Sequence, residues 1–421
     1  MAADRTLDAD PQLQVPEAAA SPRVELRRYS RALAAATIGS AAGYLINQYI
    51  NNLFAPELIA EFGWSRSDFA LISLLGLFNL MVLPVIGRMT DIYGVRRIAA
   101  IGVVAYPLTF VAYSLMSGSF VMFAAITVVQ NLLVTGTTTS TVYTRLIAER
   151  FVTARGLALA IAATAPACIG MLASPLLMLA IENFGWRMSY LFVACYVALA
   201  GVLALMLTPP RMESGSGESP KPRQIAKHDY AFILRQRVFW IITVALLLGN
   251  MIYPLQSSQM QLLLLEKGAD SQTASWLISL FAAGVMLGRF ICGISLDRLP
   301  VHLVAAFALG LPGVGLLLIE GGADGLLALS IAVLLLGGSM GAESDLFSFL
   351  TMRYFPKQMY SSVLGLIVSG MALSASLGAL ALSVTLKLTD RFDLFILIGG
   401  MANIAGGSLL LFLPRRHAAD P

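Results

Sequence analysis

The sequence predicts an all-α membrane protein with twelve transmembrane helices, arranged as two similar six-helix bundles. Of the 421 residues, 57% are hydrophobic and only 12% are charged, and the mean hydropathy is +0.78. Soluble proteins average roughly 45–50% apolar and about 25% charged residues, so this composition excludes a water-soluble fold. The apolar residues form continuous runs of about 20, the length of a helical crossing, whereas strands of a membrane barrel alternate over about 10 residues.

A short pattern that occurs twice indicates that the two bundles are copies of one unit. Gly87 and Asp91 recur as Gly293 and Asp297, and each pair is separated by 206 residues. Both occurrences follow a long apolar run. Duplicated helical halves around a central site are typical of secondary transporters.

The first six spans follow one another with short polar connections. They are expected at residues 32–58, 67–87, 97–117, 119–146, 154–182 and 188–208. The segment Ser65-Arg66-Ser67-Asp68 has the spacing of a helix-capping box, which predicts that the second helix begins there.

A polar stretch rich in Ser, Gly and Pro separates the halves and is too hydrophilic to cross a membrane. The remaining spans are expected at residues 238–263, 273–294, 302–319, 324–350, 361–386 and 393–413. The predicted organisation is a disordered cytoplasmic tail (1–30), a first bundle (31–208), a cytoplasmic linker (209–236), a second bundle (237–414) and a cytoplasmic tail (415–421).

Lys and Arg are divided unevenly between the two sides of the predicted membrane segments. The side that holds both termini carries 22 of them, the other side carries five, and Arg289 lies inside a span. Cytoplasmic loops carry such an excess, so both termini are expected in the cytoplasm. The pI near 9.0 therefore reflects membrane topology and not a nucleic-acid partner.

The connection between the second and third spans, Gly87-x-x-x-Asp91-x-x-Gly94-x-Arg96-Arg97, resembles the signature loop of the major facilitator superfamily. The resemblance covers residues 30 to 415 and implies that this loop controls conformational exchange rather than binding substrate. The gating residues it implies are Gly87, Arg88, Asp91, Gly94 and Arg96, with Asp297 in the second half.

Three further segments are similar to a bacterial branch near the monocarboxylate porters and the oxalate/formate antiporters, which implies a location in the inner membrane of a bacterium. They are Glu61-Phe-Gly-Trp-Ser-Arg-Ser-Asp68, Arg155-Gly-Leu-Ala-Leu-Ala160 and Phe184-Gly-Trp-Arg187. The fourth span lacks the arginine of many proton-coupled members. The eleventh has no lysine at mid-depth, only Lys387 near its end, so a dianionic substrate is disfavoured.

Arg289 is the sharpest candidate for substrate binding. It precedes Asp297 by eight residues, or about 12 Å of helix, which places it deep in the eighth span. A charge at that depth is costly unless it faces a partner or an aqueous site, and a guanidinium can bind a carboxylate through two hydrogen bonds. The alternative is a structural ion pair with an acid of the tenth span. The corresponding residue of the first half is Leu83.

Glu343 and Asp345 lie at a similar depth in the tenth span. The first half has Thr139 and Thr141 at these positions, so the two acids belong to the second half alone. A carboxyl group at this depth is a candidate carrier of a coupled proton. A structural role beside Arg289 or at a helix end is the competing interpretation.

Uncharged polar residues at helical spacing are candidates for orienting a substrate. They are Tyr44, Asn47, Gln48 and Asn51 in the first span, Gln130 in the fourth, and Asn250, Tyr253 and Ser257 in the seventh. The competing interpretation is that these groups form polar contacts between helices within the membrane.

The expected function is secondary transport of a small organic solute, first of all a monocarboxylate, coupled to a proton. One alternative is transport of a neutral or aromatic compound such as a drug or vitamin, with Arg289 purely structural. A more remote one is a membrane sensor without transport. No cofactor or metal is expected, because the three cysteines lack ligand spacing and the three histidines fall in loops, and no enzymatic motif is present. The expected partners are the substrate, protons and membrane lipid, and the chain is expected to be a monomer.

Overall fold

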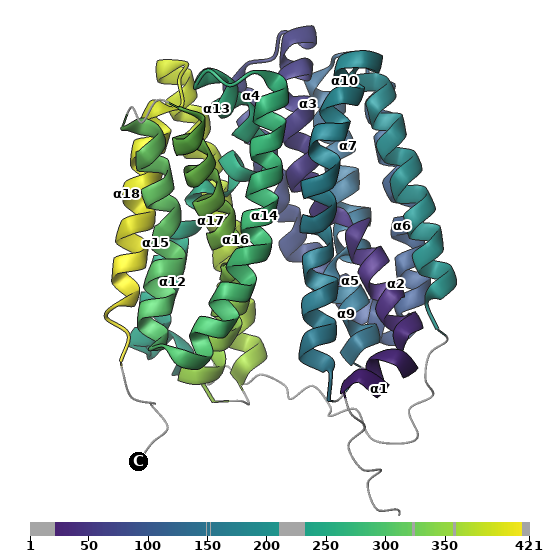
Figure 1. The fold of residues 1–421 in the computed structure, drawn as a ribbon, viewed down its shortest axis with the longest axis vertical. Helices are drawn as coiled ribbons and strands as arrows, with labels where there is room; N and C mark the ends of the chain where they lie inside the picture. Colours follow the sequence, from purple (N-terminus) through teal and green to yellow (C-terminus); the bar gives the residue numbers. More distant parts are fainter. Residues whose placement is uncertain are drawn as a thin grey trace, which may run out of the picture.

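The computed structural model describes residues 22–148, 150–151, 153–209, 232–321, 325–356 and 359–414. The regular elements of this part are helices that run along one axis in two neighbouring bundles (Figure 1). The first bundle is coloured purple to teal and the second green to yellow. Helix α1 (Pro22–Arg28) and the C-terminal end of α18 (Asp393–Leu410) lie at the same end, called here the terminal end; the opposite end is the distal end.

Several spans of the first bundle are divided into shorter segments. The first span comprises α2 (Ser30–Ala41), η1 (Tyr44–Ile46) and α3 (Asn47–Phe62); the second comprises α4 (Arg66–Leu71), η2 (Ile72–Leu77) and α5 (Phe78–Tyr93). The third is α6 (Val95–Ser114), and the fourth comprises α7 (Phe120–Gln130), η3 (Asn131–Thr135), α8 (Gly136–Thr138) and α9 (Ser140–Ala148). Element α10 (Arg155–Leu207) forms both the fifth and the sixth span.

The second bundle has one divided span, the seventh. It comprises α12 (Arg237–Gly249), η4 (Asn250–Ile252), η5 (Leu255–Gln259) and α13 (Met260–Glu266). The others are α14 (Ser271–Arg298), α15 (Val301–Glu320), α16 (Leu326–Tyr354), α17 (Tyr360–Thr389) and α18. Nine helices of the described residues are long and apolar enough to cross a membrane. One of them is the double-length α10, and the first two spans are built from shorter pieces, so the structure is consistent with twelve crossings.

Local chemistry explains where several helices begin. Ser65 Oγ accepts a hydrogen bond from the N–H of Asp68 at 3.0 Å, which confirms the predicted cap at the start of α4. Gly94, between α5 and α6, has φ of 82°, and Gly185 has φ of 78° where α10 folds back on itself. Residues with a Cβ rarely adopt such a backbone, so glycine makes both turns possible.

The N-terminal stretch differs from the predicted disordered tail, because residues 22–28 form helix α1. Glu25 is only 7% exposed, and its Oε2 accepts a hydrogen bond from the N–H of Ala154 at 2.6 Å. Ala154 immediately precedes α10, so the carboxylate satisfies a free donor at a helix start, where negative charge is also favoured. Residues 1–21, the linker residues 210–231 and the tail 415–421 lie outside the described residues.

The two halves contact each other mainly through the distal part of the molecule. Helix α17 packs on α4 and η2, α3 packs on η5 and α13, and α10 packs on α14. The side chain of Asn52 reaches backbone groups of the seventh span, and Gln259 Nε2 donates to Arg66 O at 3.2 Å. Toward the terminal end the ribbons of the two bundles diverge (Figure 1).

Candidate functional site

Five side chains from the first, seventh, eighth and tenth spans are linked by pairwise electrostatic interactions between the two halves. Tyr44 lies within electrostatic reach of Tyr253, and Tyr49 lies within reach of Arg289 and Tyr253. Tyr253 in turn lies near the carboxyl group of Glu343. The structure therefore brings together candidates that are more than 200 residues apart in the sequence.

Close packing of α14 against α16 positions Arg289. A Cβ added to Gly288 would lie 1.9 Å from Gly338 O, and one added to Gly341 would lie 1.9 Å from Val285 O. Small residues allow two membrane helices to approach this closely. Arg289 Nε consequently donates to Gly341 O at 3.5 Å, and its side chain remains partly exposed despite its depth.

Glu343 follows Gly341 by two residues on α16, so the same packing sets its position relative to α14. Its side chain is partly exposed and lies near Tyr253 of the seventh span. The side chain of Asp345, the second predicted acid, lies outside the described part of the structure. The proton-coupling role of Glu343 stays a prediction.

Tyr44 is held by the fourth span. Its hydroxyl donates to Asn131 Oδ1 at 2.5 Å, and its N–H donates to Thr138 Oγ1 at 3.1 Å. Asn131 begins the irregular segment η3, whose wider turn accompanies these contacts. Asn131 was not among the predicted residues, although its amide completes the environment of Tyr44.

Asn47 and Gln130 satisfy each other inside the first bundle. Asn47 Nδ2 donates to Gln130 Oε1 at 3.0 Å, Tyr106 Oη donates to Asn47 Oδ1 at 2.8 Å, and Gln130 Nε2 donates to Thr109 Oγ1 at 3.0 Å. Both amides are at most 4% exposed. This arrangement favours interhelical contact over substrate contact for the pair, whose binding role stays a prediction.

The remaining predicted polar residues divide in the same way. Gln48, Asn51 and Ser257 are partly exposed. Asn250 is buried, and its Nδ2 donates to Met371 O at 3.1 Å, which ties the seventh span to the eleventh. The first three are therefore better placed than Asn250 to meet a substrate.

Tyr49 is a residue that the sequence pattern missed. Its ring packs edge-on against Phe281 of the other half, with centroids 6.2 Å apart, and lies under Gly170, where a Cβ would come within 2.5 Å of the ring. Its buried hydroxyl lies near the amide of Gln48 but makes no hydrogen bond of normal geometry among the described residues. Buried polar groups are normally paired, so a partner such as substrate or water fits this position. The sequence signal that could have identified Tyr49 is its position next to the polar residues of the first span.

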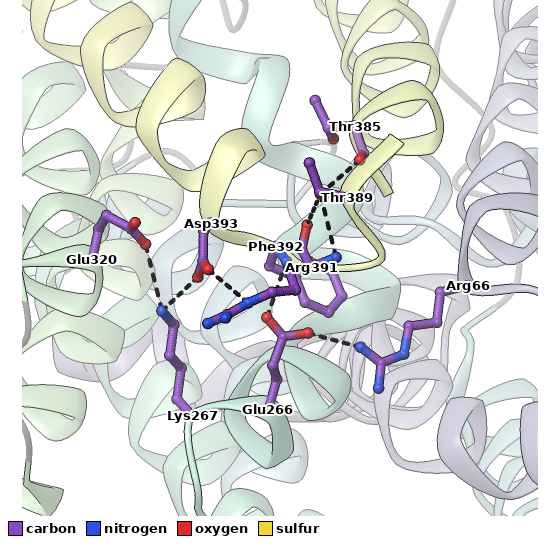
Figure 2. Close-up of polar contacts among 9 residues, drawn as sticks. All are labelled: Arg66, Glu266, Lys267, Glu320, Thr385, Thr389, Arg391, Phe392 and Asp393. Atoms are coloured by element: carbon purple, nitrogen blue, oxygen red, sulfur yellow. Dashed lines mark hydrogen bonds and ion pairs between the residues drawn. The ribbon is translucent and has the colours of Figure 1, made fainter. Parts of the chain in front are cut away.

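An ion-pair network at the distal end joins the halves (Figure 2). Arg66 Nη1 of the first half contacts Glu266 Oε2 of the second at 2.7 Å. The other carboxylate oxygen of Glu266 accepts a hydrogen bond from the N–H of Phe392 at 3.0 Å, which fixes the acid within its own half. The sequence placed Arg66 in a helix-capping segment but did not predict this ion pair.

Lys267 forms the second part of the network. Its Nζ lies 2.8 Å from Asp393 Oδ1 and 3.4 Å from Glu320 Oε2. Partial burial acts to lower the pKa of Lys267, but the hydrogen bond and negative charge of Asp393, with Glu320 beyond it, outweigh burial and raise the pKa above its ordinary value. These contacts connect the distal ends of the seventh, ninth and twelfth spans.

An apolar pocket of about 410 Å³ lies between α14 and α15 over α16. Its lining, including Leu287, Ile291 and Phe307, is hydrophobic apart from Cys292 and Ser295. Such walls offer no charge for an anion, so this pocket is distinct from the candidate site around Arg289.

The sequence matches the family description of the Major Facilitator Superfamily over residues 36–379. The chain belongs to this superfamily. It is similar to human "Monocarboxylate transporter 11", with 26% identity over 381 residues that cover 86% of this chain and 78% of that protein. The resemblance stated from the signature loop is thereby confirmed, and the protein is a multi-pass membrane transporter and not an enzyme.

Solved structures share the facilitator fold at low identity. A mutant of the nucleoside transporter NupG matches with a TM-score of 0.75 and 12% identity, covering 90% of this chain and 99% of that one. A D-xylose–proton symporter matches with a TM-score of 0.69 and 14% identity, covering 94% and 99%. A bacterial homologue of the human lysosomal transporter Spinster, in an inward-facing and unoccupied conformation, matches with a TM-score of 0.64 and 16% identity, covering 91% and 95%.

The facilitator signature loop is only partly described. The side chains of Arg88, Asp91 and Asp297, and the surroundings of Gly87, lie outside the part of the chain that the structure describes. Gly94 forms the left-handed turn between α5 and α6, and Arg96 is exposed just after it. The gating role of these residues stays a prediction.

Proposed function

We propose that this facilitator carries a small monocarboxylate anion across the bacterial inner membrane together with a proton. The observation that carries the proposal is Arg289, a partly exposed guanidinium deep in a span where the two halves meet. A planar guanidinium binds a carboxylate through two parallel hydrogen bonds. The name of the human relative, a monocarboxylate transporter, supports the same substrate class.

Glu343 is the proposed proton carrier, with Asp345 as the second candidate. Glu343 lies beside Tyr253 and two residues from the carbonyl that Arg289 contacts. A proton that travels with a monocarboxylate makes the transported pair electrically neutral. Moving a net charge through the membrane core is costly, so this pairing lowers the barrier to conformational exchange.

The hydroxyls of Tyr44, Tyr49 and Tyr253 and the polar groups of Gln48 and Ser257 are proposed to orient the organic part of the substrate. The aromatic rings supply apolar surface, while a few polar atoms fix direction, as in most small-molecule sites. No partner beyond substrate, proton and lipid is required, and we expect a monomer to be the transporting unit.

The uneven distribution of Lys and Arg supports an orientation with both termini in the cytoplasm. In that orientation the contacts at the distal end close the outer side, so the present arrangement corresponds to access from the cytoplasm. The signature loop, residues 87–97, and Asp297 are proposed to latch the cytoplasmic side in the opposite state.

A second candidate function is transport of a neutral or aromatic compound. The hydrogen bond from Arg289 Nε to Gly341 O favours it, because it gives the guanidinium a structural role between α14 and α16. The three tyrosines would then form the main contact surface for the substrate.

Uptake into proteoliposomes separates these functions. Labelled monocarboxylates, dicarboxylates and neutral aromatic compounds are offered with and without an inside-alkaline pH gradient, to the parent, Arg289→Ala and Arg298→Ala. Arg298 is the matched control, because it lies on the same helix but is exposed at its terminal end. Gradient-stimulated monocarboxylate uptake that is lost only in Arg289→Ala supports the proposal.

Uptake of neutral compounds alone, or unchanged monocarboxylate uptake in Arg289→Ala, contradicts the anion proposal. Binding without flux for every compound would instead support the sensor alternative.

A further inference from the structure

Asn52 of the first half makes contacts with the backbone of the second half. It lies in α3 and is 1% exposed. Its Nδ2 donates to Gln256 O at 2.9 Å, and its Oδ1 accepts from the N–H of Met260 at 2.7 Å. A third contact, from Nδ2 to Gln48 O at 2.7 Å, fixes the amide on its own helix.

The two backbone groups that Asn52 contacts are normally each other's partners. In an α-helix the N–H of one residue bonds to the carbonyl four positions earlier, so Met260 N–H would pair with Gln256 O. The Asn52 amide instead occupies both ends of that interrupted bond. A side chain inserted into the hydrogen-bond ladder is a recognised cause of helix distortion, and the irregular segment η5 (Leu255–Gln259) lies at this point.

The residue before η5 weakens the seventh span further. Pro254 has no N–H to donate, and the turn preceding it, η4, is also irregular. Tyr253 precedes this break and lies within electrostatic range of Tyr44, and Ser257 lies inside it and is partly exposed. Their orientation therefore depends on how the chain is wound between Asn250 and Met260.

Further contacts fix the distal side of the break. Gln259 Nε2 donates to Arg66 O at 3.2 Å, and Arg66 pairs with Glu266 at 2.7 Å. All of these contacts join the two halves, so they exist only while the halves are closed at the distal end. When the halves separate, buried backbone groups require new partners, and Gln256 O and Met260 N–H can then pair with each other.

We propose that Asn52 is a positioning residue that acts through the seventh span. By occupying the Gln256–Met260 hydrogen bond from the opposite half, it keeps the span broken and holds Tyr253 and Ser257 in their present orientation. Separation at the distal end withdraws the amide, the bond closes, and the two side chains turn with the rewound helix. The substrate-contacting role of Tyr253 and Ser257 rests on the proposed function, whereas the insertion of Asn52 does not.

The test compares Asn52→Leu with Asn403→Leu, in a background whose three native cysteines are alanine. Asn403 is a matched control, because it is also fully buried but donates only within its own helix, to Gly399 O. Spin labels at Glu182 and Lys387, exposed distal positions on opposite halves, report the distance between the halves. We expect Asn52→Leu to shift the ratio of distal-open to distal-closed molecules by about tenfold, and Asn403→Leu to leave it unchanged.

A second readout addresses positioning directly. Ser257→Cys is introduced into each background, and its rate of modification by a water-soluble thiol reagent is measured. We expect Asn52→Leu to change this rate by about tenfold and Asn403→Leu to leave it near the parental value. Asn52→Asp keeps the acceptor for Met260 N–H but loses the donor to Gln256 O, so it should fall between the parent and Asn52→Leu.

The proposal is overturned if folded Asn52→Leu matches the parent in both readouts, or if Asn403→Leu shifts them equally. If Asn52→Leu does not fold, Asn52→Asp is used instead. The proposal is then overturned if Asn52→Asp has the parental distance between the spin labels and the parental rate of thiol modification at Ser257→Cys. Neither readout uses a substrate, so failure of monocarboxylate uptake leaves both results unaffected and the two proposals are judged separately.

Discussion

The centres of the two halves are built by different chemistry. In the first half, Asn47, Gln130, Tyr106 and Thr109 form a buried, uncharged network in which the amide groups satisfy one another. In the second half, a glycine seam brings α14 and α16 together, and it consists of Gly284, Gly288, Gly337 and Gly341. Arg289 and Glu343 lie on these two helices. In the proposed function, the first half supplies a stable frame and the second half supplies the charges that bind the anion and carry the proton.

The glycine seam should show the largest effect. Gly288→Leu places a side chain where even a Cβ lies 1.9 Å from Gly338 O, so the helices must separate. Overpacking costs about 1–3 kcal/mol and more where backbone cannot move, so we expect loss of folded protein or a fall in stability of about 3 kcal/mol or more. Thermal unfolding followed by tryptophan fluorescence measures this.

Gly365→Leu is the control for this substitution, since no atom lies within 4 Å of a Cβ at that position. Equal stability of the two variants would refute the close packing of α14 and α16.

The charge at Arg289 should have the next largest effect, and it should act on transport rather than folding. Removing a charge-assisted hydrogen bond costs about 1.5–3 kcal/mol, so Arg289→Ala should raise the KM for monocarboxylate uptake by about 10- to 100-fold. Arg289→Lys keeps the charge but loses the planar guanidinium, so its KM should lie between those of the parent and Arg289→Ala. Initial rates in proteoliposomes give the KM, and an unchanged value in Arg289→Ala would remove the functional contrast between the halves.

Substitutions in the uncharged network of the first half should affect folding rather than transport. Asn47→Leu leaves the Gln130 carbonyl and the Tyr106 hydroxyl without their present partner. Leaving buried polar groups unpaired costs about 1–3 kcal/mol, so we expect a lower Tm with an unchanged preference for monocarboxylates over neutral compounds. Thermal unfolding and the uptake panel measure the two properties. A changed preference with unchanged Tm would place Asn47 in the substrate site.

The smallest expected effect concerns the distal end of the first half. Glu61 accepts hydrogen bonds from Trp186 Nε1 and from Arg187 Nη1, and these contacts lower the pKa of Glu61 below its ordinary value. A lowered pKa stabilises the folded state above the ordinary value of 4.5, and this contribution is lost as the pH falls through the folded-state pKa.

Because Glu61 is exposed, Glu61→Gln should lower stability at pH 7 by at most about 1 kcal/mol, and the difference from the parent should disappear in acid. Unfolding curves at pH 7 and in mild acid test this. If the stability difference between Glu61→Gln and the parent grew as the pH fell, the predicted direction of the pH dependence would be wrong.

The fold was largely predictable because continuous apolar runs mark membrane helices directly. The observed α14, α15 and α17 begin and end within a few residues of the expected spans. Arg289 was predictable for the same reason, since a charge inside an apolar run is conspicuous in the sequence.

The breaks within the first, second and fourth spans were not predictable from the sequence, whereas Pro254 marks the break in the seventh span but not the partner that occupies it. Gly43 lies where a Cβ would come within 2.2 Å of Thr138 O, and the break in the seventh span is occupied by Asn52, about 200 residues away in the chain. Periodicity reports which residues share a helix face but not which partner helix interrupts it. Tyr49 was missed for the same reason, because only the assembled halves show that its buried hydroxyl makes no hydrogen bond to the part of the chain that the structure describes.

The glycine seam has a consequence for the energetics of the transport cycle. Two helices packed backbone to backbone resist sliding past each other, so we expect Arg289 and Glu343 to keep a constant separation through the cycle. The seventh span, in contrast, has two ways of pairing its backbone. Substitutions in α14 or α16 should therefore change the substrate affinities at the two membrane faces by the same factor. Substitutions around the break should change their ratio, and with it the balance between loading on one face and release on the other.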